Sequence, residues 1–378
     1  MQLAKFDEYT GLRMADLESC DMLALSYFAG RGLPGLKNSD LEQWYCKRDD
    51  WAYRVRFETA RHMYRFNPKA DPPTESSYGN SLPRFLCYFL LQVLQEDCGV
   101  RYNSERKFHP ATSKPADVFA HGIMDDDGEG GTCASMPLIY VSVGRRLEYP
   151  LYLVETRGHL FCRWDDAKGT SIRWQSPDLR VRLPPERFNV EGSGLGIGYF
   201  GDAYYREFPE KWTADEIQHG WYLRSLTAKQ AMASFLVERG ECFWDFGMRQ
   251  HALQSYHYAQ QLVSDDPRYN QLAQRRGQQF ALDLFGRADH QKMQRMRLAQ
   301  AYPHGRGCAC VECFNSLNKK MSGMDHGASC QCMNCQQGKA SITPQGLQGH
   351  PSQCGCAGCR RKTNAGSPFP GHSGFGIH

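Results

Sequence analysis

Three short segments in the middle of the chain constrain the fold most: "LYLVET" (151–156), "HLFCRW" (159–164) and "RFNVE" (187–191). Each is rich in β-branched or aromatic residues and is bounded by glycine, proline or aspartate, which is typical of β-strands. The chain before residue 98 and after about residue 213 instead carries apolar residues at steps of three and four, which predicts helices. Helices, then an antiparallel sheet, then further helices together predict an α+β fold.

We divide the 378 residues into four parts: an N-terminal helical segment (1–75), a core with the sheet (76–212), a second helical segment (213–300) and a Cys/His-rich tail (301–378). The second helical segment carries residues roughly where a tetratricopeptide unit has small residues, an aromatic and a closing proline. These residues are Gly247, Ala252, Tyr256, Ala259 and Pro267. Since one unit cannot form a solenoid, the segment is expected to pack on the core, either as such a unit or as an ordinary helical hairpin.

The tail repeats the pattern H-x3-C-x-C-x2-C three times. It occurs at His304, Cys308, Cys310 and Cys313, at His326, Cys330, Cys332 and Cys335, and at His350, Cys354, Cys356 and Cys359. Three thiolates and one imidazole complete a tetrahedral shell for Zn²⁺. The tail has few large apolar residues, so a metal would have to supply its folding free energy. We predict three zinc sites, and Cu⁺ is the main alternative because thiolate clusters suit a soft cation.

Location and partners are constrained by what the chain lacks. No apolar run approaches the ~20 residues that cross a bilayer, and the N-terminus has no secretory signal. We therefore expect a cytoplasmic protein without membrane contact, in which sixteen cysteines favour metal binding or catalysis over disulfides. Residues 301–378 hold seven Lys/Arg against Glu312 and Asp325, within a net charge of +4. Binding of nucleic acid is thus expected only at the basic tail. For the chain as a whole, the expected substrate or partner is a protein or peptide.

A cysteine lies between a glycine turn and an apolar run in "GEGGTCASMPLIY" (128–140). Two glycines allow the chain to turn sharply and Thr132 can cap a helix, so Cys133 is expected in the first turn of that helix. Pro137 must also lie in the first turn, which places the start of the helix close to Cys133. A helix N-terminus favours the reactive thiolate, and its N–H groups would hold an oxyanion. A metal ligand and a buried small residue are the alternatives. The acidic segment just before it (121–131) is predicted to be a solvated mobile loop, with a cation site or a gate as alternatives.

His159 begins the second predicted strand and is the predicted base that takes the proton from Cys133. Its orienting partner is expected from "RFNVEG" (187–192). Asn189 is the first choice and Glu191 the second. Because the two share one face by strand periodicity, their spacing leaves both open.

Together, "GGTCASMP", "GHLFCRW" and "RFNVE" resemble the transglutaminase-like cysteine superfamily, whose members share a papain-like Cys–His–Asp/Asn constellation in this chain order. The similarity covers roughly residues 80–280 and is greatest to the bacterial SirB-type branch, in which tetratricopeptide-like helices follow the core. It implies a papain-like core, Cys133 as the nucleophile and His159 as the base. The third residue of the family's constellation is usually aspartate, whereas this chain has Asn189. An asparagine can also orient the imidazole, as it does in papain-like sites.

Two functions follow from these features. In the first, the chain is a cysteine-dependent amidase, peptidase or acyltransferase that acts through a thioester, and its zinc-binding tail recruits a partner or substrate. In the second, the core is catalytically silent, and the helices and Cys/His repeats bind partners or handle metal.

Overall fold

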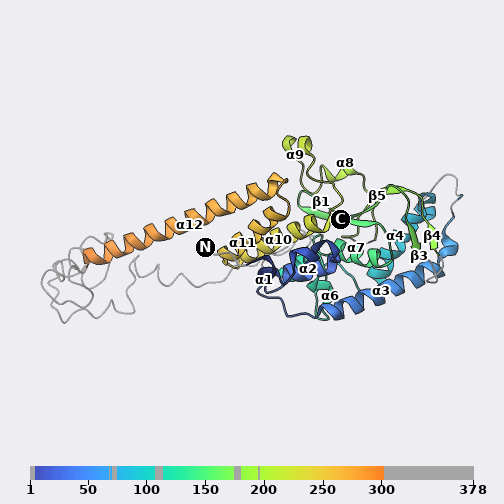
Figure 1. The fold of residues 1–378 in the computed structure, drawn as a ribbon, viewed down its shortest axis with the longest axis horizontal. Coiled ribbons are helices and arrows are strands. Elements are labelled where there is room, and N and C mark those ends of the chain that lie inside the picture. Colours follow the sequence, from blue (N-terminus) through green and yellow to red (C-terminus); the bar gives the residue numbers. More distant parts are fainter. Residues whose placement is uncertain are drawn as a thin grey trace, which may run out of the picture. The chain divides into compact units, whose positions relative to one another are not determined.

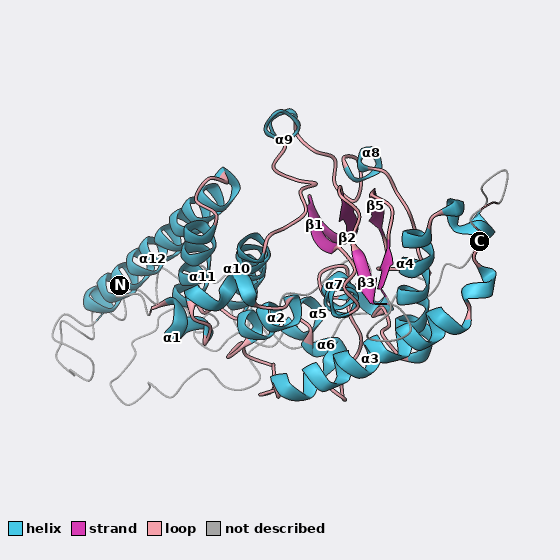
Figure 2. Cartoon of the chain, turned by 45° about the vertical axis from the view of Figure 1, so that its right-hand side comes forward, coloured by secondary structure: helices cyan, strands magenta, loops and turns pink. Residues whose placement is uncertain are grey.

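A three-stranded antiparallel sheet lies in the middle of the chain, with strand order β1-β2-β5 (Figures 1 and 2). Its strands are β1 (Leu151–Thr156), β2 (His159–Asp166) and β5 (Glu186–Val190). The computed structural model describes residues 5–67, 69, 75–106, 114–173, 180–194 and 196–301. Each strand begins and ends within two residues of its predicted range. β1 and β2 are joined by a tight turn in which Gly158 has φ +71°, a conformation that favours glycine.

The two faces of this sheet are covered differently. α7 (Met136–Arg146) packs against β1 and β2 on one face, where the Cys162 thiol donates to the Pro137 carbonyl at 3.3 Å. The opposite face carries a small apolar cluster made by Val154, Phe161, Tyr205, Trp212 and Leu223. The residues of β1 and β2 alternate between the two faces, as the strand period requires.

Two further strands, β3 (Ser171–Arg173) and β4 (Arg180–Arg182), form a separate antiparallel pair. The sequence did not predict this pair, because each strand is only three residues long. The chain is thus of the α+β class that the order of elements predicts, with antiparallel strands only among its described residues.

The chain before the sheet is mainly helical, as predicted. Its α-helices are α1 (Phe6–Thr10), α2 (Met22–Gly30), α3 (Leu41–Arg61), α4 (Leu82–Gln92), α5 (Pro115–Val118), α6 (His121–Met124) and α7. Short 3-10 turns are η1 (Met14–Ser19), η2 (Met63–Arg65), η3 (Glu75–Asn80) and η5 (Ser104–Arg106), and η4 (Val93–Asp97) is a π-helical turn. Side-chain caps fix the starts of the larger helices: Asp21 caps α2, Asp40 caps α3 and Ser81 caps α4.

The chain after the sheet is helical again. It contains α8 (Asp202–Tyr205), α9 (Ala214–His219), α10 (Ala228–Asp245), α11 (Arg249–Leu262) and α12 (Pro267–Ala301). α10 and α11 form a closely packed hairpin in which a Cβ on Gly240 would lie 2.4 Å from the Tyr256 ring. The small residue at the close contact is therefore Gly240, whereas Gly247 lies in the connecting turn with φ +75°.

The N-terminal helices, the sheet and the α10–α11 hairpin share one hydrophobic core. Arg239 of α10 is 4% exposed and donates to the carbonyls of Ala29 and Arg31, at 2.7 and 2.6 Å. Its guanidinium also lies 4.6 Å from the centre of the Tyr9 ring. The predicted boundaries near residues 75 and 212 therefore do not separate independent cores. Residues up to Ala281 form one compact unit, and the rest of α12 belongs to a second unit.

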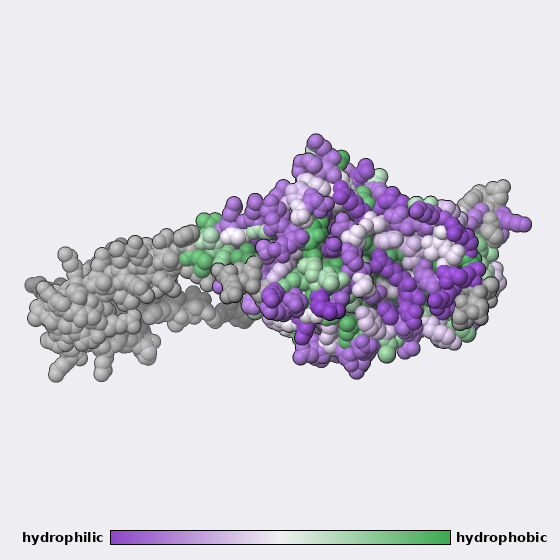
Figure 3. Space-filling view, viewed as in Figure 1, coloured by the Kyte–Doolittle hydropathy of each residue, from purple (hydrophilic) through white to green (hydrophobic). Residues whose placement is uncertain are grey.

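One face of the described surface is largely polar (Figure 3). On the face drawn in Figure 3, hydrophilic side chains predominate and apolar ones gather in small groups. Among the helices that the structure describes, none is both long and apolar enough to cross a bilayer.

Candidate active site

Cys133 lies in a turn just ahead of α7, which begins at Met136. The prediction that Cys133 lies in the first turn of the helix is therefore corrected: the helix starts three residues later. The turn still leads directly into the helix, because the Met136 N–H donates to the Thr132 carbonyl at 2.9 Å. Pro137 lies in the first turn of α7, where a backbone N–H would have no helical partner.

Buried hydroxyl groups hold this turn in place. The Thr132 and Ser135 side chains both donate to the Asp117 carbonyl, at 2.6 and 3.0 Å. Thr132 Oγ1 in turn accepts from the Ala134 N–H at 3.2 Å. Thr132 and Ser135 are fully buried, whereas Cys133 is only half-buried. The cysteine is thus held by a rigid turn without being sealed in the core.

A second segment brings Tyr102 beside the cysteine turn. The Gly131 N–H donates to the Arg101 carbonyl at 2.9 Å, and the Asn103 N–H donates to the Gly131 carbonyl at 2.8 Å. Gly130 has φ +113°, and a Cβ there would lie 2.7 Å from the Arg101 carbonyl oxygen, so this close approach requires glycine. Burial, together with the charges of Cys133 and Glu191, raises the pKa of Tyr102 to about 12. Its hydroxyl therefore stays protonated and remains a hydrogen-bond donor.

His159 at the start of β2 is hydrogen-bonded to Glu191, which directly follows β5. The distance from His159 Nε2 to Glu191 Oε2 is 2.7 Å, and the two side chains are 8% and 16% exposed. Two further donors hold the carboxylate: the Ser193 N–H at 2.8 Å and the Tyr205 hydroxyl at 3.1 Å. Backbone bonds in both directions between Glu191 and Gly198 fix the main chain at this point.

The electrostatics of the site favour a charged pair. Burial acts to lower the pKa of His159, but hydrogen bonds with Cys133 and Glu191 and the charge of Glu191 raise it to about 9. Burial acts to raise the pKa of Glu191, but its bonds with His159 and Ser193 bring the net pKa below the ordinary value. At neutral pH His159 is therefore an imidazolium and Glu191 a carboxylate.

Asn189, the first choice for the orienting residue, does not contact His159. It lies opposite Arg163 in the sheet, where its Oδ1 accepts from Arg163 Nε at 2.7 Å. Its amide nitrogen donates to the Phe200 carbonyl at 2.9 Å and to Asp202 at 2.8 Å. The prediction of Asn189 as the third residue is thus wrong for this geometry, and Glu191, the second choice, occupies the position.

Aromatic rings line the histidine. Tyr205 stacks on Phe161 with ring centres 3.8 Å apart, and the His159 ring lies 6.2 Å from Tyr205 and 6.1 Å from Phe208. Tyr205 is fully buried and belongs to the apolar cluster on this face of the sheet. Sequence reasoning missed both Tyr102 and Tyr205, since each acts through a contact distant in sequence, and no local motif marks either.

The acidic segment before Cys133 is anchored to the N-terminal helices. Asp125 accepts from the Ser39 hydroxyl and the Trp44 indole N–H, each at 2.9 Å. Asp127 pairs with Lys37, and Asp126 lies 3.8 Å from the Lys47 ammonium. Asp126 and Asp127 are exposed, as expected for a solvated segment, but both face lysines, and the bonds to Asp125 tie the segment to the N-terminal part of the chain.

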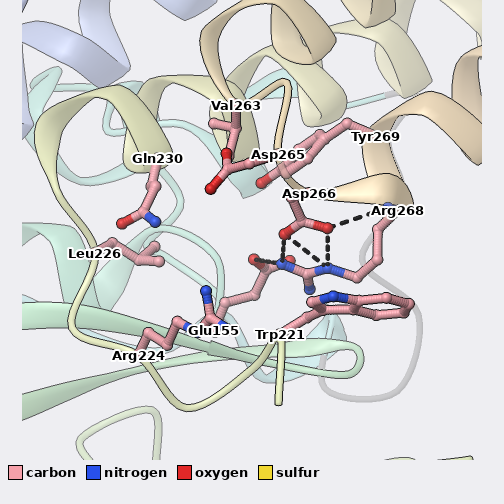
Figure 4. A pocket seen from close by; sticks show the side chains of 10 residues that line it. All are labelled: Glu155, Trp221, Arg224, Leu226, Gln230, Val263, Asp265, Asp266, Arg268 and Tyr269. Carbon is pink, nitrogen blue, oxygen red and sulfur yellow. Dashed lines mark hydrogen bonds and ion pairs between the residues drawn. The ribbon is translucent and has the colours of Figure 1, made fainter. Parts of the chain in front are cut away.

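A cavity of about 260 Å³ lies between the end of β1 and the start of α12 (Figure 4). In it, the Arg268 guanidinium lies between Asp266, at 2.6 Å, and Glu155, at 3.6 Å. The walls carry both signs of charge, and the described lining contains no cysteine, histidine or serine. The described lining of this cavity therefore offers neither a thiol nucleophile nor an imidazole base.

The twelve predicted zinc ligands, from His304 to Cys359, lie outside the described residues. Within the described residues, no group of three or more Cys, His, Asp or Glu side chains is arranged to hold a metal ion. No protein-family model, curated protein or solved structure matches the chain. Among the described residues, the groups around Cys133 therefore form the candidate active site.

Proposed function

We propose that the chain is a cysteine-dependent enzyme that acts on an amide or related acyl bond through a thioester, on a papain-like core. The observation that carries the proposal is the buried 2.7 Å bond between His159 and Glu191, on a histidine whose pKa is also raised by its interaction with Cys133. A nucleophile, a base and a residue that orients the base are the three groups that such chemistry requires. They occur in the chain order Cys–His–acid that the resemblance implies.

The roles follow from the ring nitrogens of the histidine. Since Nε2 is bound to Glu191, Nδ1 is the nitrogen left for the Cys133 thiol. At neutral pH the thiol proton resides on the imidazole as part of a thiolate–imidazolium pair, and Sγ attacks the acyl carbon as the thiolate. The amine leaves with the proton from His159, and the acyl group remains on Cys133 as a thioester. Water or a second amine then attacks the thioester and frees the thiol.

Tyr102 and the backbone of the cysteine turn supply donors for the oxyanion. The tyrosine hydroxyl stays protonated at neutral pH because its pKa is about 12. A protonated phenol beside the nucleophile is suited to stabilise negative charge that develops on the acyl oxygen. Glu191 provides the carboxylate that usually holds the histidine in the transglutaminase-like superfamily.

The test is the rate of iodoacetamide alkylation at Cys133 on the zinc-loaded full chain. Exposed Cys46 serves as an internal reference, and mass spectrometry of peptides separates the two sites. At pH 7 we expect Cys133 in the parent chain to react about tenfold faster than in the His159→Ala variant, because an adjacent imidazolium stabilises the thiolate. His219→Ala is the matched control, since His219 is exposed and its described side-chain contacts, an ion pair with Asp215 and a stacked contact with Trp221, lie away from Cys133 in sequence.

Equal and slow alkylation of Cys133 in all three proteins would end the proposal. The alternative, an interaction or metal-handling protein built on the helices and Cys/His repeats, would then be the better account. Equal and fast alkylation in all three would show that the thiol reacts without His159, which also contradicts the assigned roles.

A further inference from the structure

A second cavity, of about 350 Å³, lies beside β5 and carries an excess of positive charge. Its charged lining residues are three arginines, Arg84, Arg163 and Arg187, and one carboxylate, Asp202. An excess of guanidinium groups around a cavity is suited to an anion, because the planar fork of arginine binds carboxylate and phosphate oxygens in pairs.

Arg163 is already committed to the fold. It is 1% exposed, and its three nitrogens donate to Asn189, to the Leu223 carbonyl and to Asp202, at 2.7, 2.7 and 2.6 Å. Asp202, the carboxylate of the cavity, is thus matched by Arg163. The charges that remain for a ligand are those of Arg84 and Arg187.

Arg84 is held by aromatic rings. Its guanidinium lies 5.0 Å from the centre of the Phe188 ring and 4.9 Å from that of Tyr199. Within the described part of the chain it forms no ion pair. Contacts with ring faces position a guanidinium and leave its N–H edge available to an anion.

Arg187 is the more exposed of the two. Its side chain is 56% exposed, and its Nε lies 3.5 Å from Asp165, the residue opposite it in the sheet. At that separation the ion pair is long, and only one edge of the guanidinium is engaged. The side chain of Arg187 also lines the cavity, so its remaining N–H groups are available to a ligand there.

The position of this cavity connects it to Cys133 and His159. Arg187, Asn189 and Glu191 follow each other at steps of two along the chain, so they lie on one face of β5 and its continuation. Each step of two residues spans about 6.6 Å in a strand. Arg187 is therefore about 13 Å along the strand from Glu191, a span that about four residues of an extended peptide cover.

We propose that this cavity is a subsite for an anionic group of the substrate, a carboxylate or a phosphate, that lies a few residues from the bond attacked by Cys133. The inference rests on the proposed function and narrows it to acidic substrates. Arg84 and Arg187 bind the anion directly, and Arg163 maintains the shape of the subsite through Asn189 and Asp202.

Three alkylating peptides on the full chain test the subsite. Each carries an iodoacetyl group, one to three glycines and a final amidated residue, which is glutamate, glutamine or phosphoserine. In the parent chain we expect the glutamate reagent to alkylate Cys133 about fivefold to tenfold faster than the glutamine reagent at its best length. In the double variant Arg84→Gln/Arg187→Gln the two rates should become equal. Inorganic phosphate should suppress the preference in the parent chain.

Charge-matched controls separate the subsite from the general field of the protein. The double variant Arg180→Gln/Arg224→Gln removes the same charge elsewhere, from an arginine of β4 and one that lines the cavity of Figure 4. It should keep the preference for glutamate. The single variant Arg187→Gln changes an exposed strand position only, so a partial loss there cannot come from misfolding.

The outcomes distinguish the two proposals. A faster phosphoserine reagent that depends on Arg84 and Arg187 would identify phosphate as the natural anion, and a faster glutamate reagent would identify a carboxylate. Equal rates for all three reagents in the parent chain would overturn the subsite. If plain iodoacetamide still reacted with Cys133 in a His159-dependent way, the proposed function would stand without it.

Discussion

Replacing Glu191 with glutamine should lower the pKa of His159 and weaken the fold most at acidic to neutral pH. The pKa of His159 is about 9 in the folded chain, against 6.5 for a free histidine. One pKa unit corresponds to 1.36 kcal/mol, so the difference of about 2.5 corresponds to about 3 kcal/mol. The histidine side chain is 8% exposed, so solvent screens little of this energy.

The pH dependence follows from the direction of the shift. A raised pKa means that the folded chain binds the proton more tightly than the unfolded chain, so protonated His159 stabilises the fold. This contribution is fully present below about pH 6.5 and is lost as the pH rises through about 9. Cys133 and Glu191 both contribute, so we assign about half of this energy, about 1–2 kcal/mol, to Glu191.

Urea denaturation at pH 6.5 and pH 9.5 measures the effect, and NMR titration of the His159 ring measures its pKa. The free energy of unfolding of the Glu191→Gln variant should be about 1–2 kcal/mol lower than that of the parent chain at pH 6.5. This difference should narrow at pH 9.5. Glutamine can keep the bonds to Ser193 and Tyr205, so the shape of the site is retained. Glu210→Gln is the control, because Glu210 is 59% exposed and its ion pair with Arg157 is worth little.

Two results would refute this reasoning. One is a His159 pKa near 6.5 in the parent chain. The other is a gap between parent and Glu191→Gln that has the same size at both pH values, because a loss of packing alone does not depend on the charge of His159.

Three further predictions concern other parts of the chain. Arg163→Ala should cost about 2–4 kcal/mol in urea denaturation, because it removes a buried guanidinium and leaves the Asn189 and Leu223 oxygens without its donors; a variant as stable as the parent would contradict the assigned role. Gly240→Ala should cost about 1–3 kcal/mol, measured by the shift in Tm, because its Cβ would overlap the Tyr256 ring, whereas Gly194→Ala, with open space around it, should have almost no effect. Elemental analysis of the full chain should find up to three zinc ions, and a chain that ends at residue 301 should bind none; equal zinc in both would place the metal outside the repeats.

Much of the fold was predictable from local patterns. The three central strands and the helices on either side have strong periodicity and clear boundaries, and the structure places them within a few residues of the prediction. The shared core was not predictable, since it depends on Arg239 reaching the carbonyls of Ala29 and Arg31, about two hundred residues earlier in the chain. No window of sequence contains both partners of such a contact.

The site was predictable to a similar degree. Cys133 and His159 were found because a glycine turn before a helix and a histidine at a strand start are local features. Tyr102 and Tyr205 were not found, because each reaches the site from a separate segment. Tyr102 arrives through the pairing of residues 101–103 with Gly131, and Tyr205 arrives from the short helix α8.

The choice between Asn189 and Glu191 required the register of the sheet. Both residues lie on the same face, so periodicity alone cannot separate them, but β2 carries two polar residues that need partners on that face, His159 and Arg163. The register places Asn189 opposite Arg163 and leaves Glu191 for His159. Leaving the buried Arg163 guanidinium without acceptors would cost more free energy than moving Asn189 away from the histidine. Asn189 therefore pairs with Arg163, and Glu191 is the residue that orients His159. The same alternation places Arg163 and Arg187 on the face of His159, along which the proposed acidic substrate would extend from Cys133.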